Sequence, residues 1–479
     1  MDQQVLVIGG GIGGLSVAAD LLSQGVAVTL LEKNMALGGR AGSWQEGTYQ
    51  WPMGATAVLE PEQYRAPFLW AGRDPEAYFT LRRLAVPCFW QQDKEGHFYA
   101  GDVEMMLERF SQRDEKECSG YLNYLADGEG RYVLRRQYAR YAPDGSAQKR
   151  CIKDYGLSQP LTDWLTFMAT YPGGRSRDVR SQEVWQPAVM QLEGIWHIDG
   201  GLIAYAQALA RLIEELGGDM HTDEAAEEIV LAGGRAVGVR SRKKLYLADA
   251  VVCAIDQPAG LAKLLPQMRW DEEEWQASCG VFALHLLVEG HFPKLAAHNL
   301  LSGKKLSHSL EAAYKGSISR RPPLYLYRPA ALTDAAEDWE QLTIYCRVPN
   351  QLLRPKRWTA REKSRLIRRI LAVMADVPAL KKLPEAIRAM ACVTPLEMAR
   401  MFHTSGGAAF GPALCQGSVP EIAGLFWAGD WACGRAGVHQ VLAHSGWLSQ
   451  TLCQQLNWAQ APQAQSAHEP AGNLELSYS

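Results

Sequence analysis

The chain has 479 residues, of which 47% are hydrophobic and 21% charged, a composition typical of a globular protein too long for a single core. Its formal net charge of −3 lacks the positive excess of a nucleic-acid-binding protein, so we expect no nucleic-acid partner. The ten cysteines include no CxxC pair and no ladder of short spacings, which argues against a metal site or a disulfide framework. We therefore expect two domains, no bound metal and a reducing, cytoplasmic environment.

No stretch of the sequence has the length and apolarity of a membrane span. Charged residues interrupt every candidate before the roughly eighteen apolar residues that a spanning helix needs. The first residues lead into an apolar strand without a basic leader or a cleavage site, so we expect no secretory signal. These features predict a protein whose membrane contact, if any, is peripheral.

The N-terminal region has the pattern of a dinucleotide-binding unit. An apolar run at residues 5–8 predicts a strand, and the glycine-rich residues 9–14 (GGGIGG) predict a tight turn. Apolar positions at helical spacing follow until Gly25, and a second strand, 26–31, ends at Glu32. Strand, glycines, helix, strand and acid in this order within about thirty residues indicate dinucleotide binding.

The glycines of this turn have separate predicted roles. Gly9 permits the turn, Gly11 lets the backbone approach a pyrophosphate, and Gly14 lets the helix pack closely on the strand. The positive end of the helix dipole favours the phosphates, and Glu32 accepts both ribose hydroxyls while disfavouring a 2′-phosphate. The predicted cofactor-binding residues of this unit are Gly9, Gly11, Gly13, Gly14, Glu32 and Lys33.

The next segment, residues 37–41 (LGGRA), carries a second glycine motif. With it the sequence resembles the flavoprotein superfamily that includes amine oxidases and carotenoid desaturases. The resemblance implies that the cofactor is FAD and that Gly38 and Gly39 let the chain pass close to it. It also implies that the forked Arg40 guanidinium pairs with a flavin phosphate.

A predicted strand near the far end of the chain stops on Gly429 and Asp430. Residues 434–438 predict a turn, and the apolar positions after it predict a helix. In the superfamily, a strand that ends in Gly-Asp contacts the ribityl and pyrophosphate region. The helix that follows, which here begins near Gly437 and Val438, directs its positive end at the flavin ring.

Two further segments are similar to cofactor-binding parts of the superfamily. Gly54 and Ala55 lie in the run WPMGAT, which resembles the segment where a glycine approaches the isoalloxazine ring. A strand near Ala226 corresponds to the one that lies against adenine through its backbone. We expect residues 237–239 and 250–254 to complete one small sheet with it.

The fold class that these segments predict is α/β, with a Rossmann-type FAD-binding domain of the glutathione-reductase-like or GDI-like type. We expect three separated stretches to form this domain: residues 1–70, 190–270 and 420–457. Residues 71–189 and 271–419 are inserted and predict a mixed α+β substrate domain. Residues 458–479, rich in Pro, Gln and Ser, predict a disordered tail.

Over nearly its full length the sequence most resembles the bacterial phytoene and diapophytoene desaturases. The run at 194–201 (GIWHIDGG), its spacing to the next glycine pair, and the glycine placement within 427–445 carry this resemblance. His439 and Gln440 depart from the Pro-Gly that is usual there. Residues 429–431 (GDW) are closer to plant-type desaturases, hydroxysqualene-processing enzymes and amine oxidases, which leaves the substrate open.

The resemblance implies removal of two hydrogens from adjacent carbons of an apolar isoprenoid or carotenoid precursor. A hydride would go to flavin N5 and a proton to a base or water, with O2 or a quinone as electron acceptor. Binding would rest on apolar area, at roughly 25 cal/mol per Å², in an aromatic-rich tunnel. We expect noncovalent FAD, because no residue spacing demands a link through Cys433 or a histidine.

His439 is the one candidate catalytic residue. The resemblance places it at the helix entrance beside the flavin, where a group that titrates near neutrality moves a proton. A histidine that caps the turn or binds a backbone carbonyl is the alternative.

The stretch from Arg354 to Arg369 holds eight basic side chains in sixteen residues, with apolar residues among them. This pattern predicts a basic amphipathic helix that can lie on anionic lipid. A solvated helix face is the alternative interpretation.

Two other functions stay open from the sequence alone. One is a flavin-dependent oxidase or dehydrogenase of secondary metabolism that acts on an amine or a carrier-bound intermediate, which the fold does not separate from a desaturase. The other is a non-catalytic prenyl-lipid-binding protein of the Rab GDI type. Its weakness is that a chain without FAD has no physical need for the glycine turn, Glu32, Arg40 and Gly429-Asp430 together.

Overall fold

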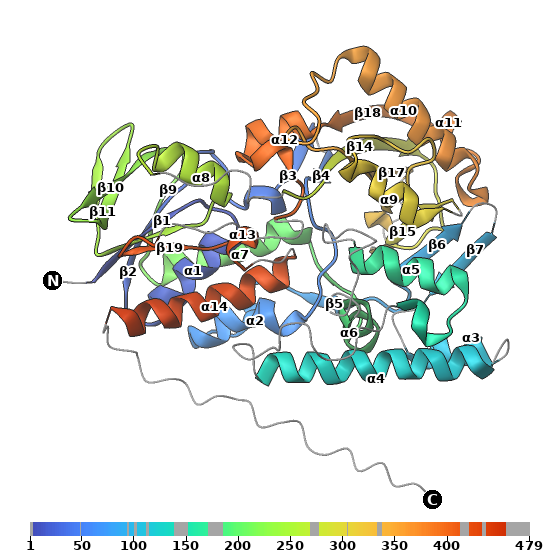
Figure 1. The fold of residues 1–479 in the computed structure, drawn as a ribbon, viewed down its shortest axis with the longest axis horizontal. Coiled ribbons are helices and arrows are strands. Elements are labelled where there is room, and N and C mark those ends of the chain that lie inside the picture. The colour runs from blue at the N-terminus through green and yellow to red at the C-terminus, as the bar shows by residue number, and fades with distance from the viewer. Residues whose placement is uncertain are drawn as a thin grey trace, which may run out of the picture.

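The protein is represented by a computed structural model in which part of the chain is described. The described residues are 3–47, 49–92, 95–99, 103–111, 115–137, 152–170, 185–268, 277–303, 305–332, 338–411, 421–433 and 437–456. The predicted tail, 458–479, lies outside them. Figure 1 shows two sheets side by side, each covered by helices.

A five-stranded parallel sheet, in the order β19-β13-β1-β2-β9, forms the first half of the molecule. Its strands are β1 (Gln4–Ile8), β2 (Ala27–Leu31), β9 (Asp219–His221), β13 (Ala250–Cys253) and β19 (Leu425–Trp427). These strands come from all three stretches assigned to the cofactor domain. The sheet is therefore discontinuous in sequence, while the exact domain boundaries stay a prediction.

Three long helices cover this parallel sheet: α1 (Ile12–Ser23), α7 (Gly201–Glu215) and α14 (Val438–Gln455). Gly14 lets α1 lie directly on β1, because a Cβ there would be 2.0 Å from the carbonyl oxygen of Gly9. Gly9 itself has φ +106, a conformation that favours glycine. The two residues thus have the packing and turn roles that the motif predicts.

The small sheet expected around Ala226 was predicted with one wrong strand, residues 250–254. β10 (Ala226–Ala232) and β11 (Arg235–Ser241) pair with β12 (Leu245–Leu247) in an antiparallel sheet of three strands. Strand β13 instead pairs in parallel with β1. All four side chains of β13 are apolar and buried, which suits a strand covered on both faces.

A seven-stranded mixed sheet, in the order β18-β14-β17-β16-β15-β6-β7, forms the second half. Its strands are β6 (Cys88–Gln92), β7 (Glu95–Tyr99), β14 (Gly280–Glu289), β15 (His298–Ser302), β16 (Leu324–Tyr327), β17 (Trp339–Val348) and β18 (Ile387–Val393). Helix α10 (Ala360–Ala375) packs on one face. The helices on the other face are α4 (Glu115–Gln137), α5 (Gln159–Thr170), α6 (Trp185–Glu193) and α9 (Leu306–Tyr314).

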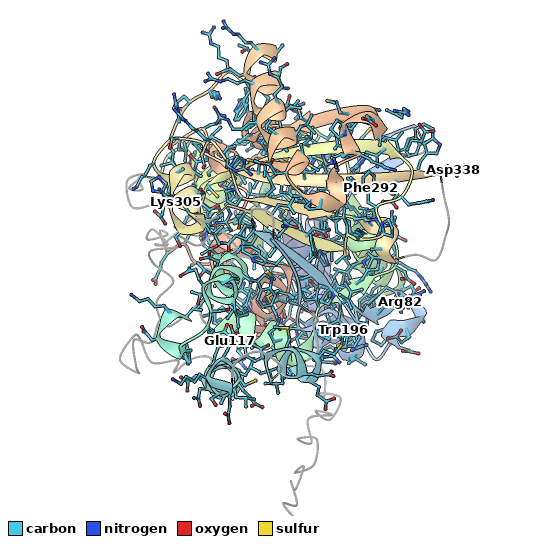
Figure 2. The ribbon with its side chains drawn as sticks, turned by 90° about the vertical axis from the view of Figure 1, so that its right-hand side faces the viewer. Arg82, Glu117, Trp196, Phe292, Lys305 and Asp338 are labelled. Atoms are coloured by element: carbon cyan, nitrogen blue, oxygen red, sulfur yellow. The ribbon has the colours of Figure 1, made fainter. Side chains whose placement is uncertain are left out.

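Residues just before the mixed sheet still belong to the first half of the molecule. Strand β5 (Leu81–Arg83) pairs with β8 (Trp196–Ile198), and Phe79 and Leu81 pack in the core beneath α1 and α7. Figure 2 labels Arg82 and Trp196 in this region. The remaining elements are α2 (Pro61–Trp70), α3 (Val103–Ser111), α8 (Gln257–Leu264), α11 (Leu383–Ala386), α12 (Pro395–Phe402), α13 (Asp430–Cys433), β3 (Ser43–Glu46) and β4 (Tyr49–Pro52).

Candidate functional site

A cavity of about 330 Å³ is lined by residues from both halves of the molecule, a size within the range of small-molecule sites. It brings together the predicted cofactor-binding residues Gly9, Gly11, Gly13, Glu32, Lys33, Gly39, Arg40, Gly54, Ala55, Ala226, Gly429, Asp430, Gly437 and Val438. Gly14 is the exception, because it faces β1. These residues are neighbours in space, and their individual roles stay predictions.

The Glu32 carboxylate is buried at the end of β2 and held in place by backbone. Its Oε2 accepts the N–H of Gly10 at 2.7 Å, and its Oε1 accepts the N–H of Asn34 at 2.8 Å. Each carboxylate oxygen keeps a second lone pair, so Glu32 can still accept hydrogen bonds from ribose hydroxyls.

The start of α1 leaves room for a phosphate group. A Cβ on Gly11, the N-cap of α1, would have no atom within 4 Å, and the same holds for Gly429. No side chain caps α1, and its first turn contains no acidic residue. The uncapped N–H groups and the positive helix dipole therefore border open space, which fits the pyrophosphate of a dinucleotide.

An ion pair between Arg40 and Asp430 links the N-terminal and C-terminal cofactor segments. The Arg40 guanidinium donates to Asp430 Oδ2 at 2.6 Å and to the Ala409 carbonyl at 2.8 Å. Arg40 was expected to pair with a flavin phosphate, and in the structure two of its nitrogens have protein partners. No sequence pattern indicated this pair, because 390 positions separate its members.

Tyr345 of β17 ties the segment around Gly54 to the mixed sheet. Its hydroxyl lies 3.0 Å from the Pro52 carbonyl oxygen and 2.9 Å from that of Gly54. Gly54 lies against Arg40, whose carbonyl oxygen would be 2.3 Å from a Cβ at position 54. Tyr345 was missed in the sequence, since it lies in no motif.

The N-terminus of α14 also lines the cavity. Gly437 is its N-cap with φ +121, and no side chain caps the helix. Residues 434–436 of the predicted turn lie outside the described ranges.

His439 lines the cavity but does not have the expected titration. Its Nε2 lies 3.5 Å from a Glu60 carboxylate oxygen, and this nitrogen has no hydrogen-bond partner. Burial lowers the pKa of His439 to about 4. The expectation that His439 titrates near neutrality is therefore wrong for the folded protein, and the imidazole is neutral at pH 7. Its catalytic role stays a prediction.

This depressed pKa predicts a pH-dependent contribution to stability. The contribution is fully present above the unfolded-state pKa of 6.5 and is lost as the pH falls through the folded-state pKa of about 4. Between pH 6.5 and pH 4, we expect His439→Gln to lose roughly 3 kcal/mol less free energy of unfolding than the wild-type protein. Urea unfolding at several pH values measures this free energy.

The matched control for this measurement is His308→Gln, since His308 is exposed on α9. A wild-type slope in the His439→Gln protein would contradict the burial of a neutral imidazole.

Away from the dinucleotide segments the cavity wall is mainly apolar. The side chains there include Met53, Leu59, Phe167, Met168, Met190, Ile195, Val281 and Leu300. Among the described residues no tryptophan lines the cavity, and its aromatic side chains are Phe167, Tyr325, Tyr345, Phe402 and Phe410. The wall therefore suits a ligand that is bound largely through apolar contact.

A buried hydrogen-bonded chain interrupts this apolar wall. The Tyr325 hydroxyl lies 2.5 Å from Thr56 Oγ1 and 2.6 Å from His298 Nδ1. Burial lowers the pKa of His298 to about 3, so its imidazole is neutral. A neutral imidazole can accept a hydrogen bond from the phenol, which gives the apolar wall one polar, hydrogen-bonded group.

The parallel sheet, the glycine turn and the cavity that they border define a dinucleotide-binding protein of the Rossmann type. The family model described as flavin containing amine oxidoreductase matches residues 12–343, and the chain belongs to this family. The protein is thus an FAD-dependent oxidoreductase.

Curated relatives extend over nearly the whole chain. The zeta-carotene-forming phytoene desaturase of Myxococcus xanthus is 27% identical, with 96% of this chain and 95% of the relative covered. The 4,4'-diapophytoene desaturase (4,4'-diaponeurosporene-forming) of Staphylococcus haemolyticus is 24% identical, with 91% and 96% covered. The resemblance to these desaturases is confirmed.

Solved structures share the fold at lower identity. An oxidoreductase from Methanosarcina mazei superposes with a TM-score of 0.63 at 15% identity, covering 94% of this chain and all of that one. Cyclohexylamine oxidase from Brevibacterium oxydans has a TM-score of 0.60 at 13% identity, covering 95% of this chain and 100% of its own. Rab GDI from Plasmodium falciparum has a TM-score of 0.56 at 11% identity, covering 96% of this chain and 100% of its own. These likenesses confirm the predicted fold class.

Proposed function

We propose that the protein desaturates an apolar isoprenoid or carotenoid precursor with a noncovalently bound FAD. The observation that carries this proposal is the continuity of the cavity. One end is bordered by Glu32, Gly11 and the start of α1, and the other is the apolar wall formed by α5, α6 and the mixed sheet.

The protein's own residues would bind and orient both partners. Glu32 would hold the ribose, the start of α1 the pyrophosphate, and the segment at Gly54 the ring. FAD, when bound, supplies the two-electron acceptor for a hydride. The apolar wall would bind the substrate and exclude bulk water, and the departing proton would go to a base or a water molecule.

Product formation tests this function. The purified protein should show flavin absorption bands, and incubation with phytoene or diapophytoene in liposomes, under air and with a quinone, should give red-shifted polyene peaks. Flavin bands without polyene product would instead favour the oxidase of secondary metabolism that acts on an amine or a carrier-bound intermediate. A protein that takes up no flavin after reconstitution would favour the prenyl-lipid-binding alternative.

The noncovalent attachment has a separate test. Cys433 follows Asp430 in α13, and its Sγ lies 3.4 Å from the Asp430 carbonyl oxygen. We expect acid precipitation to release all flavin into the supernatant. A yellow pellet would show a covalent link.

A contact with anionic lipid through the stretch from Arg354 to Arg369 is also proposed. The apolar residues of α10, including Leu366 and Ile370, are buried against the mixed sheet. Its arginines at 361, 365 and 368 are exposed, and Figure 2 shows nitrogen-tipped side chains around the uppermost helix. Any contact through α10 would thus be electrostatic. Among the described residues no helix is long and apolar enough to span a bilayer.

We expect the protein to pellet with phosphatidylserine vesicles at low salt and to be released at about 0.5 M salt, where charges are screened beyond a few ångströms. Reversal of the three exposed arginines to Glu should abolish pelleting. The control carries the same charge change at the exposed residues Lys153, Lys294 and Lys305. Equal loss in both variants would contradict a role specific to α10.

A further inference from the structure

Arg347 is a cation in the apolar part of the cavity wall. It lies on β17 opposite Val281 of β14, and both residues line the cavity. Its Nη2 donates to the Thr170 carbonyl, and its Cζ lies 5.7 Å from the centre of the Phe167 ring. Its Nη1 is closed off from solvent and has no hydrogen-bond partner.

Arg347 forms no ion pair with a carboxylate of the described residues, whereas two other arginines near the cavity and the mixed sheet do. Arg40 is paired with Asp430, and Arg328 on the same mixed sheet has Glu340 at 2.6 Å. A guanidinium in apolar surroundings without a counter-charge is unfavourable. The charge therefore needs a reason that the contacts of the described residues do not give.

The position of Arg347 relative to the cofactor segments suggests that reason. Tyr345 precedes it by two residues on the same face of β17 and is bound to the Gly54 carbonyl. Arg347 thus lies roughly 7 Å further along the strand, away from the segment expected beside the flavin ring. A ligand that passes Tyr345 along this face would bring its end to the guanidinium.

We propose that Arg347 binds a carboxylate at one end of a substrate whose remaining length is apolar. This inference rests on the proposed function and narrows its substrate class. Phytoene and diapophytoene, in the names of the curated relatives, are hydrocarbons without an anionic group. A carboxylate would supply the missing counter-charge and accept charge-assisted hydrogen bonds from the guanidinium.

The test compares two ligands that differ only in charge. The flavin-loaded protein is titrated with cis-parinarate, a conjugated C18 carboxylate that fluoresces on leaving water, and with methyl cis-parinarate. A charge-assisted contact predicts that the acid binds at least about tenfold tighter than the ester. Equal dissociation constants in the wild-type protein overturn the inference, as does the absence of binding by both ligands.

Variants assign the preference to this residue. Arg347→Met should bring the acid-to-ester ratio close to one by weakening only the acid, and Arg347→Lys should keep part of the preference. Arg361→Met, on the exposed face of α10, is the matched control and should keep the full ratio. A preference that survives Arg347→Met overturns the inference.

The flavin content of each variant separates this inference from the proposed function. Full flavin in Arg347→Met together with a lost preference supports a substrate contact. A fall in flavin content with the acid preference intact would mean that Arg347 serves the cofactor, which overturns the inference and leaves the flavin enzyme standing. Failure of the flavin enzyme itself would appear as absent flavin in the wild-type protein.

Discussion

Gly14→Ala is expected to destabilise the protein by about 3 kcal/mol, because the added methyl group has no room. Its Cβ would lie 2.0 Å from the Gly9 carbonyl oxygen and 3.2 Å from the Ala254 Cβ. Since the nearer atom belongs to the backbone, relief requires α1 to move away from β1. The denaturation midpoint in urea, measured on the flavin-free protein, gives the change.

A wild-type midpoint in Gly14→Ala would show that α1 and β1 are not in the close contact described above. Gly25→Ala is an unsuitable control, because Gly25 has φ +82 and any side chain there is strained. The informative comparison is with Gly11, which has both room for a methyl group and an ordinary backbone conformation.

Gly11→Ala should have the opposite effect: a normal fold and a large loss of flavin affinity. Gly11 has φ −75, which any L-residue adopts, and a Cβ there would have no protein atom within 4 Å. The methyl group would instead enter the space assigned to the pyrophosphate. We expect affinity to fall by about 1–3 kcal/mol, or roughly 5- to 150-fold, as measured by titration of the flavin-free protein with FAD.

The two alanine variants together locate the phosphate. An unchanged midpoint with weakened FAD binding in Gly11→Ala is the expected result. Wild-type affinity would contradict the placement of the pyrophosphate at the start of α1, whatever the result for Gly14→Ala.

Local sequence patterns were enough to predict the cofactor unit. The strand, glycine turn, helix and second strand follow one another directly, and the structure places them within a few residues of the expected bounds, with β1 at Gln4–Ile8 and α1 at Ile12–Ser23. One reason is that the closest packing contact of the motif lies within the same unit. Gly14 meets Gly9, which is only five positions away in the sequence.

Features that depend on distant parts of the chain were harder to predict. Strand β13 was assigned to the wrong sheet, because four apolar residues do not specify which strand they pair with. The depressed pKa of His439 follows from complete burial, which only the tertiary packing determines. The hydrogen bonds of Tyr325 and the unpaired Nη1 of Arg347 belong to no motif, so no sequence pattern indicated either.

The Arg40–Asp430 ion pair has a consequence for the order in which the protein matures. β1 and β2 leave the ribosome early, but their neighbour β13 and the edge strand β19 are synthesised much later. The nascent chain must therefore keep a glycine turn and a partly formed sheet exposed until residues near 430 emerge, and such long-range pairing is slow. Flavin capture would then be a late event, which makes bound flavin a report on completed folding.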